Sequence, residues 1–399
     1  MTVDPPVTDP HPREYDVVVF GATGFTGELT AAYLAEHAPS DLRWALAGRN
    51  LDKLRQVRTR LVATNPALGE LPLLSADITD EASLRSVAES ARVVITTVGP
   101  YLEYGEPLVA ACAEAGTDYV DLTGEPEFVD RMYLQHQDRA VATGARIVHA
   151  CGFDSIPHDL GAWFTVQQLG ADAPITLRGV VRSAATFSGG TFHSALGAMS
   201  RARQMREAMQ ARRKKEGKPA SRSSRAVTGR PGRDRVLGLW LLPLPTIDPF
   251  VVARSGAALP SYGPDFRYSH YAGLKTLRYT VGGAAAVSGL AVAVQVKPVR
   301  NLLKSKVKQG EGPTHERRDK SWFTVDFVGE SAGRTVHTRV TGGDPGYTET
   351  AKMLAESAMC LALDDNPSTA GQVTTATAMA ENLLSRLQKA GITFEVVSQ

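Results

Sequence analysis

The stretch that decides the fold is YDVVVFGATGFTG, residues Tyr15–Gly27. Its first six residues form a short, largely apolar run rich in valine, which is typical of a strand buried in a parallel sheet. Three glycines, Gly21, Gly24 and Gly27, follow at once, and a helical pattern continues to about His37. A strand that leads through a glycine-rich turn into a helix predicts a corner that binds the phosphates of a dinucleotide.

The same alternation of strand and helix continues to about residue 150. Apolar runs that predict further strands lie at Leu42–Ala47, Leu71–Ser75, Val93–Val98, Tyr119–Leu122 and Arg146–Ala150, with helical patterns between them. Strands that alternate with helices favour an α/β domain with a doubly wound parallel sheet. We therefore expect a tail over residues 1–14 and a Rossmann-type domain over residues 15–155.

After Pro157 the pattern changes, which predicts a second, α+β domain over residues 156–343. We expect a strand at Ile175–Arg182, a helix at Thr191–Arg213, an exposed loop over 212–235, and a hairpin formed by Trp322–Val328 and Arg334–Val340. The hairpin favours an antiparallel or mixed sheet. Residues 344–399 carry two strong helical patterns, at Tyr347–Leu363 and Thr374–Gln388.

The composition excludes several classes of protein. The formal net charge of the 399-residue chain is +2, so no general field attracts nucleic acid. Its three cysteines, Cys112, Cys151 and Cys360, lie far apart and form neither a disulfide framework nor a metal-binding pattern. These features indicate a cytoplasmic protein without a metal site, and the first residues lack the apolar core of a signal peptide.

The glycine-rich corner predicts a set of cofactor-binding residues. Gly21 allows the tight turn, Gly24 lets the backbone approach the pyrophosphate, and Gly27 lets the helix pack against the strand. The full set of expected cofactor contacts is Gly21, Thr23, Gly24, Phe25, Thr26, Gly27, Arg49, Asn50, Lys53, Asp77, Thr97, Val98, Gly99 and Pro100.

The end of the second strand indicates which dinucleotide binds. The sequence there is Ala47-Gly48-Arg49-Asn50, with Lys53 one turn later, and it lacks the carboxylate that binds the ribose of NAD. Arg49 and Lys53 suit a 2′-phosphate, so the sequence favours NADP(H). Arg49 as a solvated loop charge and Asp77 as a turn or helix-capping residue remain alternatives.

Several longer motifs resemble those of one known family. They are GATGFTG (21–27), ALAGRN (45–50), residues 96–125, CGFDSIPHDLG (151–161), SGGT (188–191), residues 343–362 and residues 383–396. Together they resemble the saccharopine dehydrogenase-like oxidoreductases, and most of all the mycobacterial trans-acting enoyl reductases, over residues 14–396. The resemblance implies that the helices of 344–399 return to the Rossmann domain.

The resemblance also implies an activity. Trans-acting enoyl reductases reduce an α,β-unsaturated thioester carried by a polyketide synthase, in the synthesis of complex lipids such as phthiocerols and phenolphthiocerols. Two alternatives stay open: an amine or imine oxidoreductase that resembles saccharopine reductase, and a non-catalytic Rossmann scaffold on membrane or lipid surfaces. A homodimer is also an open option.

Enoyl reduction needs a donor for the developing enolate oxygen and a proton for the α-carbon. Candidate catalytic residues at the carboxyl edge of the sheet are Tyr101, Tyr104 and His158. Candidate substrate contacts are Glu125, Asp154 and the Ser188-Gly189-Gly190-Thr191 turn. Each has a structural alternative, such as helix capping by Asp154 or an interdomain ion pair of Glu125.

Residues Tyr279–Val296 carry no charge over 18 positions. Three interpretations remain open: a buried or partly buried helix in the second domain, a helical hairpin or amphipathic element resting on a membrane with the following cations on anionic headgroups, and a membrane span. The second interpretation corresponds to peripheral association with the inner face of the plasma membrane. The basic residues of 201–235 suggest either a solvated surface or a docking site for an acidic carrier domain.

Overall fold

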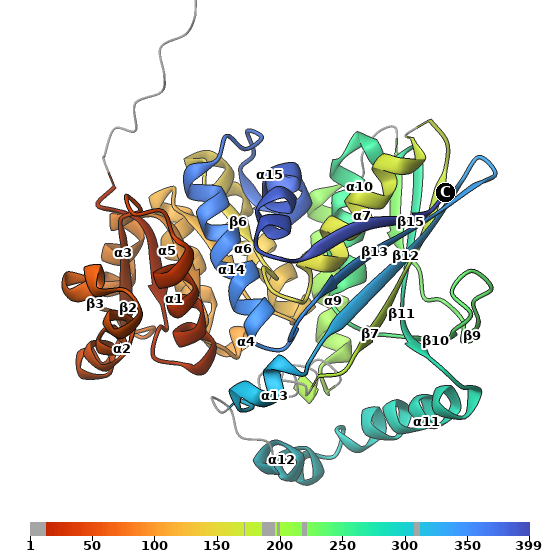
Figure 1. The fold of residues 1–399 in the computed structure, drawn as a ribbon, viewed down its shortest axis with the longest axis horizontal. Helices are drawn as coiled ribbons and strands as arrows, with labels where there is room; N and C mark the ends of the chain where they lie inside the picture. Colours follow the sequence, from red (N-terminus) through yellow and green to blue (C-terminus); the bar gives the residue numbers. More distant parts are fainter. Residues whose placement is uncertain (1–12, 171, 186–195, 198–199, 218–221, 307–311) are drawn as a thin grey trace, which may run out of the picture.

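The computed structural model describes residues 13–170, 172–185, 196–197, 200–217, 222–306 and 312–399. Two β-sheets lie toward opposite ends of the molecule, and a layer of helices fills the space between them (Figure 1). The Ser188–Thr191 turn predicted as a substrate contact lies outside the described residues, as do residues 1–12 of the predicted tail.

The first sheet has seven parallel strands in the order β14-β6-β5-β4-β1-β2-β3. Their bounds are β1 Tyr15–Phe20, β2 Trp44–Gly48, β3 Leu73–Ser75, β4 Ala91–Thr96, β5 Asp118–Asp121, β6 Arg146–Val148 and β14 Gly371–Val373. All six residues of β1 are buried, as its apolar sequence predicts. The predicted doubly wound parallel sheet is confirmed; β1 has the predicted bounds, and the boundaries of β2 to β6 differ from the predicted ones by at most two residues.

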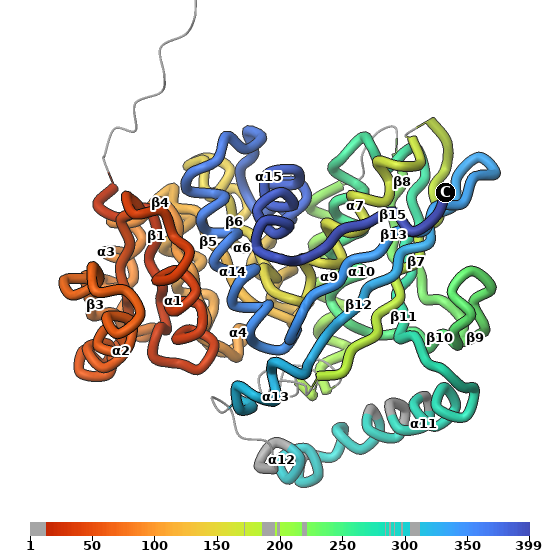
Figure 2. The backbone as a smooth tube through the Cα atoms, in the orientation of Figure 1, coloured from red at the N-terminus to blue at the C-terminus, as the bar shows by residue number. Residues whose placement is uncertain are grey.

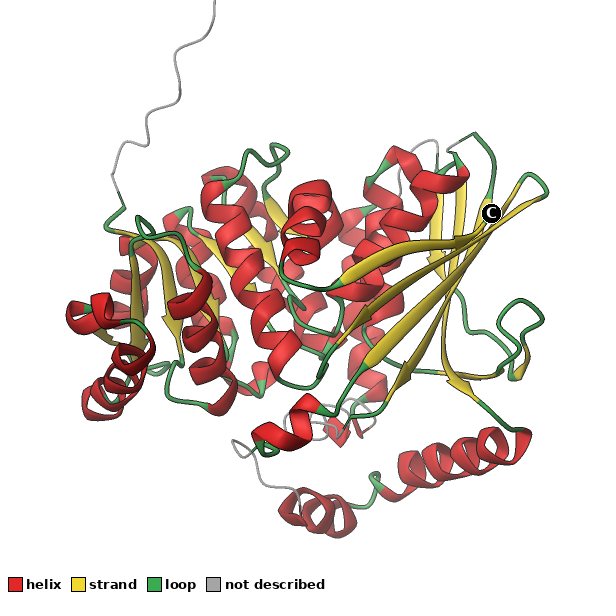
Figure 3. Ribbon diagram, in the orientation of Figure 1, coloured by secondary structure: helices red, strands yellow, loops and turns green. Residues whose placement is uncertain are grey.

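Helices cover both faces of this sheet (Figure 3). They are α1 Phe25–His37, α2 Leu51–Thr64, α3 Glu81–Ser90, α4 Tyr101–Tyr104, α5 Glu106–Ala115 and α6 Pro126–Thr143, with a short 3-10 turn, η1, at Pro66–Glu70. Because all the strands run in parallel, the loops after β1, β4, β5 and β6 meet at one edge. That edge holds the predicted cofactor residues.

The second sheet has eight strands and is mixed, as the sequence favoured. Its order is β15-β13-β12-β7-β11-β10-β9, with β8 paired to β11. The bounds are β7 Ile175–Ser183, β8 Ser223–Ala226, β9 Gly232–Arg233, β10 Trp240–Pro243, β11 Asp265–Leu274, β12 Phe323–Ser331, β13 Arg334–Gly342 and β15 Thr393–Ser398. The predicted hairpin is β12–β13, paired in register from Phe323–Gly342 to Ser331–Arg334.

The last 56 positions of the chain join the two sheets. Helix α14 (Thr348–Leu363) packs on α1 and on β4 and β5, and α15 (Thr375–Lys389) packs on α14 and on α7 (Ile156–Leu169). The sequence prediction contained neither β14, which extends the first sheet, nor β15, which extends the second. One apolar core runs from Val17 in β1 through Met353 in α14 to Phe327 in β12.

The prediction of an exposed loop over residues 212–235 is only partly right: most described residues there are exposed, but part of the segment is regular structure. Helix α9 (Ala202–Glu216) continues into it, and β8 and β9 follow. Arg212 is buried and forms ion pairs with Asp130 and Glu216. Because the buried carboxylate of Asp130 needs a partner, this arginine stabilises the packing of α9 on α6. The sequence predicted a loop because the segment is rich in cations.

The uncharged segment 279–296 forms a peripheral helix. Helix α11 (Leu277–Ala293) and helix α12 (Lys297–Lys306) lie along one side of the molecule, below α13 (His315–Asp319) and the second sheet (Figure 2). Large apolar side chains such as Val281 and Val292 are exposed while Thr280 is buried, so the helix is partly buried, as the first interpretation allows. In the described part of the chain, no helix combines the length and the apolar character that a bilayer crossing requires.

Candidate active site

The glycine-rich corner has the geometry that its sequence predicts. Gly21 has a φ of 86°, a left-handed conformation that favours glycine, and a Cβ there would lie 2.6 Å from Val98 Cγ2. A Cβ on Gly27 would lie 2.3 Å from the carbonyl oxygen of Gly21. Gly21 and Gly27 are therefore required by the protein's own packing.

Gly24 differs from the other two glycines. A Cβ at this position would meet no protein atom closer than 3.5 Å, so the protein alone does not require glycine here. Gly24 is exposed and is the N-cap of α1, and no side chain caps this helix end. The first amides of a helix lack partners within it and, with the helix dipole, attract anions. The corner thus offers open space in front of a helix end suited to a pyrophosphate.

Three other predicted contacts belong to the same corner. Thr97 donates its hydroxyl to the carbonyl oxygen of Gly21, at 3.1 Å, and so holds the loops after β1 and β4 together. Thr23 and Thr26 are partly exposed beside Gly24. The ring of Phe25 packs edge-on against Tyr347, with ring centroids 4.9 Å apart. Phe25 therefore contributes an apolar contact between α1 and the approach to α14.

The end of β2 carries the cations expected to select the phosphorylated cofactor. Arg49 and Lys53 are both exposed. Asn50 is the N-cap of α2, where its Oδ1 accepts the Lys53 amide at 3.0 Å. Its side-chain oxygen is thus used by the helix, while the side chains of Arg49 and Lys53 stay exposed to solvent.

Asp77 is a turn residue with a link to Arg49. Its Oδ1 accepts the amide and the hydroxyl of Thr79, at 2.9 and 2.8 Å. These hydrogen bonds and, more weakly, the charge of Arg49 hold the pKa of Asp77 below its usual value. The structural alternative for Asp77 is therefore observed, and Arg49 lies close enough to affect it.

The structure gives Tyr101 a scaffolding role, which differs from the catalytic role expected from the sequence. Its buried hydroxyl donates to the carbonyl oxygen of Thr96 and accepts the amide of Leu122, both at 3.1 Å. Burial raises the pKa of Tyr101 well above its usual value. Both hydrogen-bonding positions are thus used between the loops after β4 and β5. Tyr104, in contrast, is 43% exposed.

Glu125 also organises these loops. Its buried carboxylate accepts the amides of Tyr101, at 3.3 Å, and Leu102, at 2.9 Å, at the start of α4. A negative charge there complements the helix end. This arrangement holds Gly99 exposed and Val98 and Pro100 partly exposed along the cofactor edge. The expected substrate contact of Glu125 is instead a contact within the protein.

A buried group of charged side chains lies beyond the loop after β6. His158 Nδ1 is 3.0 Å from Asp248 Oδ1, and the other oxygen of Asp248 is 3.7 Å from His270 Nε2. The hydroxyl of Tyr268 is 3.0 Å from His270 Nδ1. His158, Asp248 and His270 are each at most 4% exposed. Helices α7 and α10 (Asp248–Ala258) and strand β11 supply these residues.

The charges within this group balance. Burial alone would lower the pKa of His158, but the carboxylates of Asp248 and Asp154 outweigh it and raise that pKa. Burial likewise opposes ionisation of Asp248, yet His158 and His270 lower its pKa. Burial lowers the pKa of His270 to about 3. At neutral pH His270 is therefore neutral, while Asp248 is ionised and favours the protonated form of His158.

Asp154 connects the buried group to the edge of the first sheet. It is partly exposed, and its Oδ2 would lie 3.8 Å from a Cβ on Gly124, in the loop after β5. Burial, together with the charge of Asp248, raises the pKa of Asp154 to about 7, although His158 opposes this. Asp154 can thus hold or release a proton near neutral pH.

His158, Asp248 and His270 are the described histidines and carboxylates that come close enough together to hold a metal ion. Asp248 is paired with His158 in this group. The sequence predicts His158 and Asp154 as site residues, but it does not predict Asp248 and His270. Neither belongs to a motif, and only the fold brings α10 and β11 to α7.

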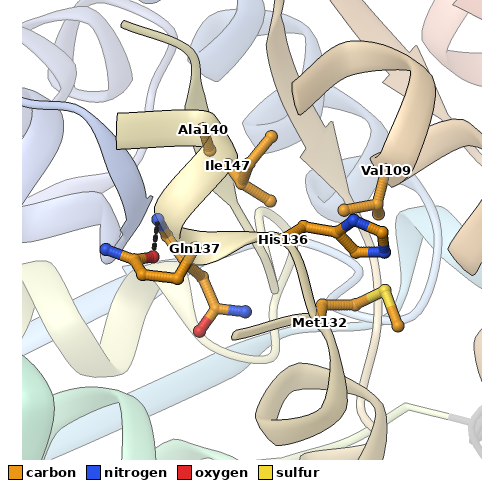
Figure 4. Close-up of a pocket in the computed structure, with 7 residues that line it drawn as sticks. Val109, Met132, His136, Gln137, Ala140 and Ile147 are labelled. Carbon is orange, nitrogen blue, oxygen red and sulfur yellow. Dashed lines mark hydrogen bonds between the residues drawn. The ribbon is translucent and has the colours of Figure 1, made fainter. Parts of the chain in front are cut away.

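Two hollows lie away from this edge. Figure 4 shows residues that line one of them, between α5, α6 and β6, where the backbone amide of Gln372 donates to Gln137 Oε1 at 2.6 Å. This hollow has no room for a water molecule. The other, of about 840 Å³, is lined by residues such as Arg13, Arg92 and Arg146, which precede or begin strands of the first sheet. It therefore lies at the opposite, amino-terminal edge.

Comparisons with known proteins agree with this arrangement. The family model of the saccharopine dehydrogenase NADP-binding domain matches residues 17–148. The chain is 39% identical to a putative trans-acting enoyl reductase of Mycobacterium tuberculosis, and the alignment covers 96% of this chain and 98% of that protein. It is 36% identical to the trans-acting enoyl reductase of Mycobacterium bovis, with the same coverage.

Among solved structures, the chain is similar in fold to saccharopine dehydrogenase (L-Glu forming) from Saccharomyces cerevisiae. The TM-score is 0.56, and the alignment covers 96% of this chain and 100% of that one, at 12% identity. This likeness confirms the two-sheet fold.

Proposed function

Because this chain belongs to the family of trans-acting enoyl reductases and carries a saccharopine dehydrogenase NADP-binding domain, we propose that it reduces α,β-unsaturated acyl or polyketide thioesters with NADPH. The similarities establish an NADP(H)-dependent oxidoreductase. The thioester substrate, its delivery on a polyketide synthase carrier domain, and products of the phthiocerol and phenolphthiocerol type are our proposal.

One observation carries this proposal. The parallel strands bring the open helix end at Gly24 to the same edge as Asp154, since the loops after β1, β4, β5 and β6 are neighbours there. A hydride donor bound at this corner and an acid at Asp154 would then lie at the same edge of the sheet. Enoyl reduction needs both.

The chain's residues fit the cofactor in two places. The amides at the start of α1 would hold the pyrophosphate, since Gly24 leaves open space in front of them. Arg49 and Lys53 would hold the 2′-phosphate. NADPH, when bound, supplies the hydride that reaches the β-carbon of the substrate.

Asp154 is the proton donor that the structure supports best. With a pKa of about 7, it is close to half protonated at neutral pH, and its partial exposure lets it recover a proton from water. In the proposed step the Asp154 carboxyl gives its proton to the α-carbon, where negative charge develops as hydride arrives at the β-carbon. The charges of Asp248 and His158 act on Asp154 in opposite directions.

The described cations of the second sheet do not favour an amino-dicarboxylate substrate. Arg182 and Arg339 both pair with Asp326. Arg178 pairs with Asp234 and Glu330. These guanidinium groups are neutralised by the protein and do not form a site for two substrate carboxylates. This observation favours an acyl thioester over a substrate like saccharopine.

A substrate comparison tests the proposal. Purified full-length protein is mixed either with NADPH and a trans-2-enoyl thioester or with NADP and saccharopine, and the absorbance of NADPH is followed. We expect oxidation of NADPH in the first mixture and no formation of NADPH in the second. Turnover of saccharopine alone would contradict the proposal.

The variant Gly24→Val tests where the cofactor binds. It should abolish NADPH binding without unfolding the protein, because its side chain would occupy the open space rather than protein atoms. Gly69→Val is the matched control, since a Cβ there meets no atom within 4 Å. Normal NADPH binding by Gly24→Val would place the cofactor elsewhere.

A further inference from the structure

The most unusual surface of the molecule belongs to the two peripheral helices α11 and α12, which we call the peripheral arm (277–306). Among the described residues, fourteen large apolar side chains are exposed, and seven of them lie in the arm. These seven are Leu277, Tyr279, Val281, Val292, Val296, Val299 and Leu302. So dense an apolar surface marks a contact with something outside the chain.

Helix α11 has two distinct faces. Thr280 and Val294 are buried, and a Cβ on Gly283 would lie 3.2 Å from Leu242 in β10, so this side contacts the body. Val281 and Val292 are eleven residues apart, which is close to three turns, and they point to the other side of the helix. They are 60% and 72% exposed, so the outward face is apolar.

The charged side chains of the segment that contains the arm are all positive. The segment from Phe266 to Gly310 contains eight Lys and Arg residues and neither Asp nor Glu, whereas the whole chain has a net charge of only +2. Lys275 and Arg278 are exposed, and Arg300 is partly exposed. The guanidinium of Arg278 lies 5.1 Å from the centroid of the Tyr279 ring, which is 57% exposed.

We propose that the outward face of the peripheral arm docks on the surface of an anionic lipid bilayer. The exposed valine and leucine side chains would enter the boundary between headgroups and acyl chains, while Lys275, Arg278 and Arg300 meet lipid phosphates. Tyr279 is amphipathic, which suits this boundary. The absence of acidic residues from the segment matches an anionic surface, and α11 lies on this surface without crossing it.

The far end of the arm leads to the cofactor corner. Beyond residue 311 the chain reaches Phe25, since a Cβ on Gly312 would lie 2.2 Å from its ring. The guanidinium of Arg318, in α13, lies 5.6 Å from the same ring. A bilayer under the arm would thus face the side of the molecule where α13 meets the glycine-rich corner (Figure 1). On the proposed function, this surface would bring a membrane-held acyl chain to the cofactor.

The test measures binding of the full-length protein to vesicles by co-sedimentation. Vesicles are made of phosphatidylcholine alone or of phosphatidylcholine mixed with phosphatidylglycerol. We expect strong binding to the anionic vesicles only, and weaker binding as salt is added.

Two triple variants separate the contributions. Lys275→Gln/Arg278→Gln/Arg300→Gln should weaken binding to anionic vesicles about fivefold for each cation removed. Leu277→Ser/Val281→Ser/Val292→Ser should weaken it at least tenfold. The controls replace exposed side chains elsewhere. They are Arg85→Gln/Lys214→Gln/Arg235→Gln and Val141→Ser/Val236→Ser/Leu363→Ser, and both should bind like the unchanged protein.

Three results would overturn the inference: no binding to either vesicle, equal loss in variants and controls, or a dimer formed without lipid that only the apolar arm variant disrupts. The last result would identify a second copy as the partner. Turnover of a short, soluble enoyl thioester is measured in parallel and should be unchanged in the arm variants. If the unchanged protein does not reduce this thioester, the proposed function is contradicted, but the membrane-docking inference still depends on the vesicle result alone.

Discussion

The glycine-rich corner and the buried His158 group lie at the same edge of the fold but are built in different ways. The glycines of the corner come from seven consecutive residues. The His158 group comes from α7, α10 and β11, and its residues are spread from His158 to His270 along the chain. The first can therefore be predicted from local pattern, whereas the second exists only once two domains have packed.

The comparison predicts that the two regions fail differently when mutated. The largest effect should follow Asp248→Ala, which leaves the protonated His158 buried without its partner. We expect the free energy of unfolding to fall by about 3–5 kcal/mol, measured by chemical denaturation. Asp52→Ala, in an exposed pair with Arg55, should change it by less than about 1 kcal/mol. An equal loss of stability in both variants would mean that the buried ion pair contributes no more to the free energy of unfolding than the exposed pair does.

Asp154→Asn should separate chemistry from folding. Losing the proton donor should lower kcat about a hundredfold, while NADPH still binds at the glycine-rich corner. Asp154→Glu should restore part of the activity because it keeps an acid at this position. Stopped-flow measurement of NADPH oxidation checks both variants. An Asp154→Asn protein with normal kcat would remove Asp154 from the mechanism.

The pH dependence of the reaction should reflect Asp154. Its pKa is about 7, and the protonated form donates, so kcat should be constant at low pH and fall about tenfold per pH unit above 7. Asp248 faces Asp154 and should stay ionised through this range, because its pKa is lowered, while the carboxylate of Asp248 raises the pKa of His158. A profile that keeps this slope in Asp154→Asn would assign the titration to another group.

The smallest expected effect concerns cofactor choice. Arg49→Gln should weaken NADPH binding about five- to tenfold and leave NADH binding unchanged, since Arg49 is exposed and would meet only the 2′-phosphate. Arg55→Gln, on the outer side of α2, is the control. Fluorescence titration with both nucleotides provides the measurement. An equal loss of affinity for NADH would mean that Arg49 contributes to the binding of both nucleotides and does not select the phosphorylated one.

These differences explain how much the sequence could predict. The strands β1–β6 have apolar runs and glycine or polar ends, so their order along the chain was readable. Strands β14 and β15 were not, since β14 has three residues and four of the six residues of β15 are exposed beyond Phe394. Both depend on tertiary packing, and so does Arg212, whose burial no local pattern indicates.

In the candidate site, too, features set by local sequence were predictable and features that depend on tertiary packing were not. Gly21, Gly24, Gly27 and Arg49 occupy the positions that the motif predicts. Tyr101 was assigned to catalysis because tyrosine is a plausible acid, but its hydrogen bonds to two loops depend on how β4 and β5 pair. Asp248 and His270 lie far from any motif, so the partners of His158 appeared only in the structure.

An isotope experiment tests the central claim, enoyl reduction at this site, most directly. The full-length protein is given a trans-2-enoyl thioester with NADPH carrying deuterium at the transferable position, and separately with ordinary NADPH in deuterated water, and the product is analysed by NMR. We predict one deuterium on the β-carbon in the first case and one on the α-carbon in the second. Deuterium from the nucleotide at any other carbon, or no saturated product, would contradict the account.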